Sequence, residues 1–506
     1  MALCLRPRAA FRIRPCPHPL LQHLQPSSLS QCVASSRSPP GASPSLRQPL
    51  LSQQCRSTHS RRNVTSTAYE IKEESPATTD MSRTTLLSPL PLSNVIRSYL
   101  ITSVSSIPIL LRPSLAAMSF LAHTKSPLFN PDRNPILHFL LKKTFYAQFC
   151  AGETPEEVKQ TIASLKSIGF KGVILGHAKE VVLSKEEEEG LDQAKDAMEQ
   201  SEINAREISA WEQNTMDTIN LTQPGDFVAL KFTGAGRQAL QHLKATIACS
   251  PEFEQAVHDM CKLAQSRGVR LLFDAEQASL QQGIDNWTMY FAKIFNKERA
   301  LVFGTYQAYA KRTPKVLASH LDVARKEGFV LGVKLVRGAY LGSDPRELFW
   351  PTAEDTHKCY NSLAKSIIQR QYGEMLQPVE GRSSEFPRVS LVLATHNAQS
   401  VKMALQLRDE QARKGEELIE LAYGQLMGMA DHVSCEVVQA ARARANAQDP
   451  HLEVPSAYKY LVWGKLGECM KYLLRRAHEN KDAVSRTVEA RQALARELGS
   501  RLAFWR

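Results

Sequence analysis

The stretch VLGVKLVRGAY, residues 330 to 340, decides the fold. Its first seven residues are apolar or glycine apart from Lys334, and this near-continuous pattern is typical of a strand buried on both faces of a parallel sheet. Arg337 and Tyr340 follow at its C-terminal end, where parallel α/β folds collect their reactive groups. The stretch therefore predicts a core strand with candidate functional residues at its C-terminal end.

Seven further runs of this kind occur, and helical patterns separate most of them. They cover residues 145–152, 172–178, 227–234, 269–276, 300–309, 389–397 and 418–426. Eight strand–helix units predict an α/β fold, a distorted (βα)8 TIM-like barrel with a helical and targeting extension at its N-terminus. The largest insertions are expected at residues 179–226 and 373–388.

The first interval between these runs shows why they are expected to be helical. Thr154 is a suitable N-cap, Pro155 suits the first helical position and Glu157 suits a capping box. Apolar residues then recur at helical spacing until Gly169, which predicts the end of the helix.

Charge is distributed unevenly along the 506 residues. The net charge of +12 first suggests nucleic acid, but residues 1–69 contain nine arginines and no acidic residue, and the remainder carries 54 basic against 51 acidic side chains. The remainder therefore has no basic footprint for nucleic-acid binding. An acid-free leader rich in Arg and Ser predicts a disordered mitochondrial transit peptide over residues 1–69; a plain disordered tail is the alternative.

Three further segments complete the expected organisation. Residues 70–144 are predicted to form a helical extension, residues 145–482 the barrel and residues 483–506 a C-terminal helix. Within the extension, residues 98–111 are apolar but shorter than the roughly 20 residues that span a bilayer. This segment either packs on the domain or lies at a membrane surface. The six cysteines beyond the leader show no metal-ligand spacing, so no metal site is expected.

Polar side chains gather at the predicted strand exits. Each alone has a structural explanation, since a polar residue at a strand end often satisfies loop backbone. Their repetition on almost every strand predicts a shared pocket. They are Glu153, His177, Lys231, Asp274, Glu276, Gln307, Arg337, Tyr340, His396, Asn397 and Gln425.

A polar stripe marks the last predicted barrel helix. Tyr472, Arg475, Arg476 and Glu479 fall at helical spacing i, i+3, i+4 and i+7, so they share one face. The stripe is either a solvated face with an Arg–Glu pair or a guanidinium fork for an anion.

FTGAGRQA, residues 232–239, matches a dinucleotide fingerprint. The acidic residues that end the next predicted strand lie about forty residues away, whereas the fingerprint places them about twenty residues on. The motif therefore fits a loop after the third predicted barrel strand better than a Rossmann turn.

Six motifs occur in order and together resemble the proline dehydrogenase family over residues 145–480. They are FDAE, TYQAYAKRTP, GVKLVRGAYL, ATHNAQSV, YGQLMGM and YLLRRAHEN. The resemblance implies a mitochondrial flavoenzyme on the matrix side of the inner membrane. It would oxidise L-proline to Δ1-pyrroline-5-carboxylate with non-covalently held FAD and pass electrons to ubiquinone.

The resemblance also implies roles for the substrate-binding residues. Arg475, Arg476 and Lys231 would hold the carboxylate of proline. Three tyrosines, Tyr340, Tyr460 and Tyr472, would wall the ring, and Asp274 would support that wall by hydrogen bonding.

Glu153 would pair with Arg475 as a gate over the bound substrate. Tyr460 stands twelve residues before Tyr472, as in relatives that prefer proline, which favours proline over hydroxyproline.

The cofactor set carried over by the resemblance is larger. It comprises Gln307, Lys334, Val336, Gly338, Thr395, His396, Asn397, Gln425 and Glu479, with Arg476 reaching the cofactor from the helix. Bacterial relatives carry Arg where this chain has Lys334, which can still donate but without the planar fork.

The alternatives are a hydroxyproline dehydrogenase of the same fold, an NAD-dependent dehydrogenase that uses the GAGRQA loop, and a non-enzymatic barrel at the membrane.

Overall fold

The computed structural model describes residues 85–124, 126–178, 197–447, 449, 451–481 and 484–503. Side chains are described for these except residues 108, 197–200, 478–481 and 484–489. The predicted transit peptide, most of the acidic part of the predicted insertion 179–226, and the side chain of Glu479 lie outside this description.

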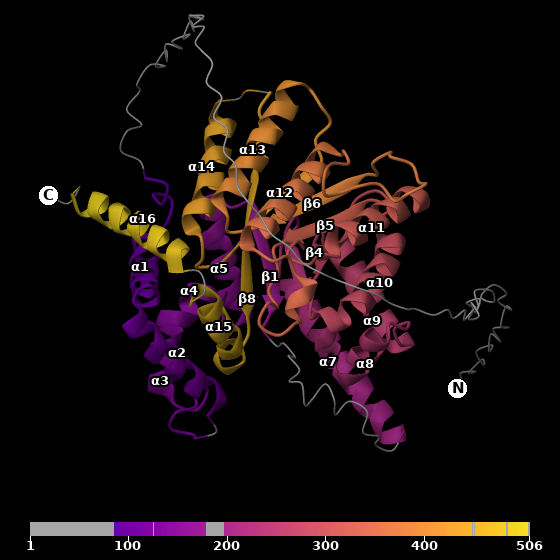
Figure 1. Cartoon of the computed structure of the whole chain (residues 1–506). Helices are drawn as coiled ribbons and strands as arrows, with labels where there is room; N and C mark the ends of the chain where they lie inside the picture. Colours follow the sequence, from indigo (N-terminus) through magenta and orange to yellow (C-terminus); the bar gives the residue numbers. More distant parts are fainter. Residues whose placement is uncertain are drawn as a thin grey trace, which may run out of the picture. The chain divides into compact units, whose positions relative to one another are not determined.

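Eight parallel strands form a closed barrel in simple sequence order (Figure 1). Its last strand pairs with its first, with Gly172 opposite Tyr458 and His177 opposite Trp463. The predicted barrel is confirmed. The strands are β1 (Gly172–His177), β2 (Phe227–Leu230), β3 (Arg270–Phe273), β4 (Val302–Gln307), β5 (Leu331–Val336), β6 (Val389–Ala394), β7 (Glu420–Leu426) and β8 (Ser456–Trp463).

Helices cover the outside of the barrel and follow the strands in turn. After β1 comes α7 (Ala197–Leu221), after β2 come α8 (Arg237–Ala245) and α9 (Pro251–Ser266), and the later strands are followed by α10 (Ala278–Phe295), α11 (Thr313–Glu327), α12 (Ala353–Gln369), α13 (Ala398–Arg413), α14 (Asp431–Ala447) and α15 (Leu466–Lys481). Helix α16 (Val484–Ala503) occupies the predicted C-terminal helix. The predicted insertion 373–388 lies between α12 and β6.

The first predicted strand, residues 145–152, is wrong. This stretch is a π-helix (Lys142–Tyr146) and a short helix α4 (Ala147–Phe149), and only Cys150 makes a single bridge, to Val462. Its continuous apolar character reflects burial of helical residues against α15, which a short apolar run does not distinguish from a buried strand.

The strand that the prediction missed is β8. Lys459 interrupts its apolar run, yet the side chain is almost fully buried and forms an ion pair with Asp431 at 2.7 Å. The predicted count of eight strands is therefore right with one member exchanged, and Lys231 follows the second strand rather than the third.

Helix α5 (Pro155–Ile168) lies before β1 and begins and ends where the sequence predicts. Thr154 caps it by accepting from the Glu157 N–H, and Gly169 ends it with φ of 107°. The predicted capping box is wrong, because the Glu157 carboxylate accepts from the N–H of Glu153 at 2.9 Å instead of that of Thr154.

The barrel interior is packed with side chains, as expected for eight strands. Phe227, Phe303 and Tyr458 pack edge to face across its lower part. Below them the Arg270 guanidinium lies 3.9 Å from the Phe227 ring centroid and pairs with Glu420. The N-terminal end of the barrel is thus closed, so any site must open at the opposite end.

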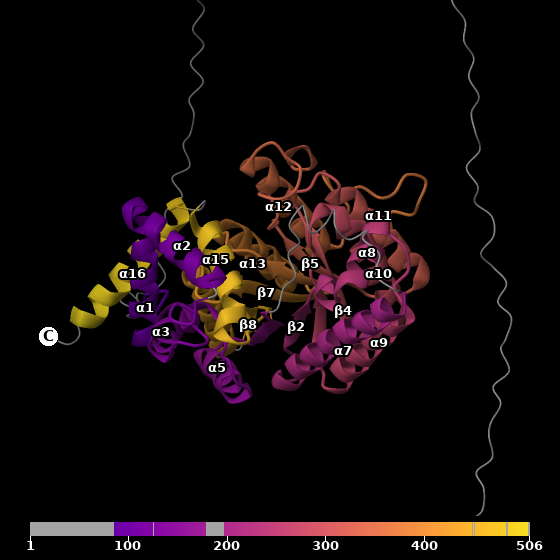
Figure 2. The ribbon, with the colours of Figure 1, turned by 90° about the horizontal axis from the view of Figure 1, so that it is seen from below.

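Three helices near the N-terminus pack beside the barrel: α1 (Leu92–Ser106), α2 (Pro108–His123) and α3 (Pro135–Leu141). Helix α1 runs against α16, and α2 packs along α15. Figures 1 and 2 show this group gathered on one side of the barrel.

Helix α10 approaches α8 closely at Gly283. A Cβ built there lies 2.4 Å from the carbonyl oxygen of Leu243, whereas nothing lies within 4 Å of a Cβ at Gly499 in α16. Gly283→Ala is therefore expected to lower the free energy of unfolding by about 1–3 kcal/mol in urea denaturation. The matched control Gly499→Ala is expected to raise it by up to about 1 kcal/mol, because alanine favours the helix. Equal effects of the two substitutions would contradict the close packing.

Candidate active site

Three of the predicted site residues meet inside the C-terminal mouth of the barrel. Asp274 follows β3, Lys334 lies in β5 and Tyr460 lies in β8. The Lys334 ammonium forms an ion pair with the Asp274 carboxylate, and the side chains are only 7% and 12% exposed. The Tyr460 hydroxyl donates to the other Asp274 oxygen at 3.4 Å. The mouth therefore contains a buried charge pair that orients a tyrosine.

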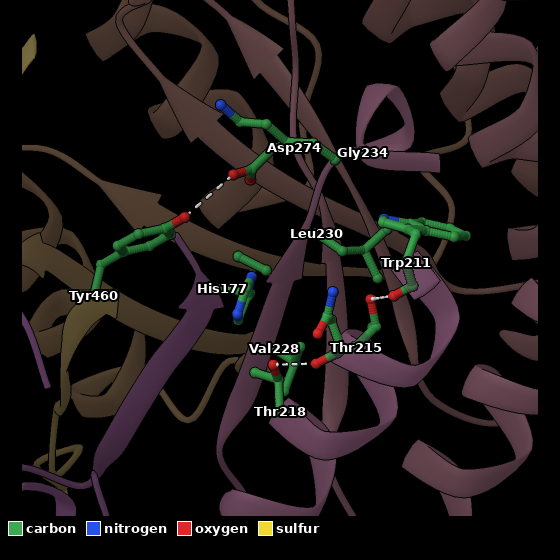
Figure 3. Close-up of a pocket in the computed structure, with 12 residues that line it drawn as sticks. His177, Trp211, Thr215, Thr218, Val228, Leu230, Gly234, Asp274 and Tyr460 are labelled. Atoms are coloured by element: carbon green, nitrogen blue, oxygen red, sulfur yellow. Dashed lines mark hydrogen bonds between the residues drawn. The ribbon is translucent and has the colours of Figure 1, made fainter. Parts of the chain in front are cut away.

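A small cavity of about 50 Å³ opens beside this group (Figure 3). Lys231, Asp274 and Tyr460 line it together with His177 at the end of β1. Gly176 provides room for the tyrosine, since a Cβ there would lie 3.1 Å from the Tyr460 hydroxyl. The cavity brings Lys231 next to the Asp274–Tyr460 pair, as the sequence predicts for a shared pocket.

Helix α7 supplies the far wall of the cavity. Figure 3 shows Trp211, Thr215 and Thr218 from this helix facing the strand ends. These residues were not predicted because they lie in the middle of a helix, where no motif marks them. His177 was predicted only as a polar residue at a strand end, and nothing else in the sequence singles it out.

Helix α15 carries the predicted substrate stripe. Tyr472 and Arg476 are buried at 5% and 7% exposure, and the Arg476 guanidinium carbon lies 5.3 Å from the Tyr472 ring centroid. Tyr472 belongs to an apolar cluster against which Tyr460 packs. Two of the three predicted wall tyrosines therefore share one cluster. Arg475 is half-buried.

Tyr340 does not line the small cavity. It lies half-buried in the loop after β5, and its N–H donates to the Tyr309 hydroxyl at 3.3 Å. The ring of Tyr309 in turn stacks on Phe349, with centroids 4.2 Å apart. Burial raises the pKa of the Tyr309 hydroxyl, which keeps it protonated as a donor and acceptor in this loop.

Tyr309 and Gln307 line a second, larger cavity of about 320 Å³ at the end of β4. Its other lining residues include Thr305, Arg312 and Phe349. The predicted cofactor residue Gln307 therefore lies at the edge of open space, with its amide donating to the Glu276 carbonyl at 3.2 Å.

Most of the other predicted cofactor residues lie at or just after the C-terminal ends of β5, β6 and β7. The His396 Nε2 accepts from the Leu426 N–H at 3.1 Å, and the Gln425 amide donates to the Thr395 carbonyl at 3.2 Å. Asn397 caps α13 by accepting from the Ser400 N–H. Val336 ends β5, and Gly338 follows with φ of 141°. The set forms one continuous arc of the rim.

Arg337 was left out of the predicted cofactor set although it ties this arc together. Its guanidinium donates to His357 at 2.9 Å, to Thr395 Oγ1 at 2.5 Å and to Ser400 Oγ at 3.0 Å. The only sequence signal was an arginine at a strand exit, which does not distinguish a structural role from a binding role.

The residues of this arc fit a flavin cofactor. Within the described part of the chain, the buried Gln425 Oε1 and Thr305 Oγ1 have no hydrogen-bond partner, and a buried polar atom normally has one. A flavin ring carries both donors and acceptors, so it offers partners of the kind that the Gln425 amide oxygen in this arc and the Thr305 hydroxyl in β4 lack. The Lys334 ammonium adds a cation inside the mouth.

Glu153 is held at the start of α15. Its carboxylate accepts from the Leu466 N–H at 2.8 Å and pairs with Lys142 at 2.7 Å and His138 at 3.0 Å. Burial raises the pKa of Glu153, but the bonds from Lys142 and Leu466 outweigh it and hold that pKa below the usual value. The stability that this carboxylate contributes is therefore present at neutral pH and is lost as pH falls through its depressed pKa.

Glu153→Ala is expected to loosen α15 and to weaken substrate binding by about tenfold, because the helix loses a charged cap at its N-terminus. Glu156→Ala in α5 is the matched control, since Glu156 is exposed. The KM of the substrate and the pH dependence of unfolding between about pH 3 and 6 measure the effect. An unchanged KM for Glu153→Ala would remove both the gate hypothesis and this positioning role.

The chain is similar to known proteins in sequence and in fold. A family model described as proline dehydrogenase matches residues 158–489. The chain is 28% identical over 457 residues to a probable mitochondrial proline dehydrogenase of Schizosaccharomyces pombe, covering 80% of this chain and 89% of that protein. It is also 28% identical over 403 residues to hydroxyproline dehydrogenase of Bos taurus, covering 72% and 82%.

Among solved structures, proline utilization A (PutA) from Bdellovibrio bacteriovorus, inactivated by N-propargylglycine, is similar in fold. Its TM-score is 0.56 at 15% identity, and the match covers 79% of this chain and 40% of that chain. At this identity the likeness shows the fold.

Proposed function

The chain belongs to the proline dehydrogenase family, and on that premise we propose that it oxidises L-proline to Δ1-pyrroline-5-carboxylate, with FAD as cofactor and ubiquinone as electron acceptor. The observation that carries the proposal is the buried group at the barrel mouth, in which Lys334 pairs with Asp274 and Asp274 orients Tyr460. This group lies next to the Lys231 cavity and packs through Tyr460 against the cluster that contains Tyr472.

Three cations would bind the carboxylate of proline. Arg475 and Arg476 offer planar forks from α15, and Lys231 offers an ammonium from the end of β2. A guanidinium that is almost fully buried binds a carboxylate strongly, because little water competes for either charge. Fixing the carboxylate in this way leaves one orientation for the ring.

Two aromatic walls would hold the ring itself. Tyr472 and Tyr460 share the cluster on the α15 side, and Tyr340 would approach from the loop after β5. Because Asp274 fixes the Tyr460 hydroxyl and Gly176 abuts it, a hydroxyl group on the substrate ring has little space there. We therefore favour proline over hydroxyproline, although relatives with either name exist.

The FAD would be held by the residues that the family resemblance assigns to it, with Arg476 reaching it from α15. They are Gln307, Lys334, Val336, Gly338, Thr395, His396, Asn397, Gln425 and Glu479. When bound, FAD supplies an acceptor for the hydride from C5 of proline. The amine of proline must lose its proton before or with the hydride, and solvent can take it, so no side chain is assigned as general base.

The location follows from the leader and from the relatives' names. Residues 1–69 have the composition of a transit peptide, and the S. pombe relative is named as mitochondrial. We place the protein on the matrix side of the inner membrane, where ubiquinone is available.

The NAD-dependent alternative is disfavoured by the helix that follows the GAGRQA loop. The Glu207 carboxylate accepts from the Arg237 N–H at 2.8 Å, so a carboxylate already occupies the N-terminus of α8 where a pyrophosphate would bind.

The test is turnover by the FAD-loaded protein with proline and with trans-4-hydroxy-L-proline, using a ubiquinone analogue or NAD as acceptor. The expected result is proline-dependent quinone reduction with a higher kcat/KM for proline and a rate that rises as bound proline is deprotonated. A higher kcat/KM for hydroxyproline would transfer the assignment to the hydroxyproline enzyme, and NAD reduction would restore the GAGRQA reading.

A further inference from the structure

Exposed apolar side chains concentrate in one region of the chain. Among the described residues, twenty large apolar side chains are exposed, and thirteen of them lie between Leu86 and Leu140. A soluble domain rarely exposes so many within so short a segment unless the surface binds something.

The strongest part of this region is formed by the end of α2, the loop that follows and α3. The rings of Phe120 and Phe129 contact each other with centroids 5.4 Å apart, which joins α2 to the loop. The Asn134 side chain donates to the Leu128 carbonyl at 2.7 Å and caps α3, which joins the loop to that helix.

We call this the α2–α3 surface and define it by its six exposed apolar residues. They are Phe120, Leu128, Phe129, Ile136, Phe139 and Leu140, with exposures from 45% to 81%. The last three fall at i, i+3 and i+4, so they form one stripe along α3.

The charges around this surface are mostly positive. Residues 85–149 contain six basic side chains and a single acidic one, Asp132. Arg133 and Lys143 are exposed on either side of the α3 stripe, and the Lys143 ammonium lies 6.0 Å from the Phe139 ring centroid. An apolar stripe with a cationic rim suits an anionic lipid surface, where rings enter the acyl boundary and cations meet the headgroups.

We infer that the α2–α3 surface docks the protein onto an anionic membrane without crossing it. No helix in the described ranges is long and apolar enough to span a bilayer by itself, and α1 and α2 pass that test only as a pair bent by 103°. One face of each of these helices also packs against the protein. Val95 and Ser98 are buried in α1, and Leu111, Leu115 and Met118 are buried in α2. Such helices lie on a membrane rather than in it.

Lipid is a better occupant than the chain itself. The leader carries nine arginines and no acidic residue, so it has the same charge sign as the surface. A second copy would bring the same cationic rim face to face, and like charges in an interface are unfavourable.

The inference rests on the proposed function in one respect. The proposed electron acceptor, ubiquinone, is dissolved in the membrane, so the protein must reach the membrane to reduce it. The geometry supports this use, because the opposite face of α2 packs along α15, the helix that carries Tyr472, Arg475 and Arg476. Docking would therefore bring the substrate helix close to the bilayer.

The test is flotation of the full-length protein with vesicles made of equal parts phosphatidylcholine and phosphatidylglycerol. Flotation is measured at raised salt, because salt screens the charge of the arginine-rich leader that all variants share. Ile136→Glu and Phe139→Glu are each expected to weaken binding by about tenfold or more. Each substitution removes a large apolar group that the membrane would bury and adds an anion. Ile136 lies in the first turn of α3, where a carboxylate does not disturb the helix.

Ile247→Glu is the matched control, since Ile247 is 51% exposed after α8 and is expected to leave binding unchanged. Turnover with proline and a water-soluble dye should be equal in all variants, whereas turnover with a long-chain quinone in the vesicles should fall only in the two α3 variants. Wild-type protein that does not float, or α3 variants that float equally well, would overturn the inference. So would a wild-type dimer that Ile136→Glu converts to a monomer. If the wild-type protein did not turn over proline with the dye, this result would instead count against the proposed function.

Discussion

Arg476→Ala is expected to lower kcat/KM for L-proline by about 10²–10⁴-fold. The guanidinium is almost fully buried beside Tyr472. Each hydrogen bond to a charged group contributes about 1.5–3 kcal/mol, and a forked contact loses two of them. Steady-state kinetics at saturating FAD measure the loss, and thermal unfolding separates it from a loss of fold.

Two further substitutions make this result specific. Arg476→Lys keeps the charge but loses the planar fork, so an intermediate loss is expected. Arg496→Ala removes an exposed arginine from α16 and is expected to leave kcat/KM unchanged. If Arg476→Ala were as active as Arg496→Ala, the stripe on α15 would be structural and the carboxylate fork would be rejected.

Asp274→Ala is expected to lower the free energy of unfolding by about 3–5 kcal/mol, because it leaves the Lys334 ammonium buried without its counter-ion. The substitution also removes the acceptor that orients the Tyr460 hydroxyl, so proline turnover should fall with stability. Urea denaturation measures the first effect and kcat/KM the second.

A double substitution separates the two roles of this pair. Asp274→Leu combined with Lys334→Met removes both charges, so most of the lost stability should return, while turnover should not. Lys358→Ala is the control, because it breaks an ion pair with Glu374 whose side chains are 59% and 69% exposed, and it should leave the free energy of unfolding nearly unchanged. A double variant with normal turnover would show that the pair only stabilises the barrel.

The parallel barrel could be predicted because most of its strands are buried on both faces. Seven runs between residues 172 and 426 are nearly continuous in apolar residues, and each became a strand. The failures arose where tertiary packing reverses the local signal. Residues 145–152 are apolar because they pack on α15, whereas β8 contains Lys459, whose burial depends on the distant Asp431. No local pattern identifies either case.

The candidate site was only partly predictable for a similar reason. Parallel strands end at one rim, so Lys231 and Asp274 could be expected near one another. Lys334 and Tyr460 were expected at the site only from the family resemblance, because β8 was not predicted, and the structure places all four near one another. The contribution of α7 and the network around Arg337 depend on which helices pack over which strand ends. The packing of these helices is decided only when the whole barrel has formed, so no local sequence pattern predicts it.

A visible absorption spectrum shows directly whether the protein holds a flavin that proline reduces. The spectrum of the purified FAD-loaded protein is recorded before and after addition of L-proline without oxygen. We expect flavin bands that bleach when proline is added. Bound flavin that proline leaves oxidised, or no bound flavin after supplementation with FAD, would contradict it.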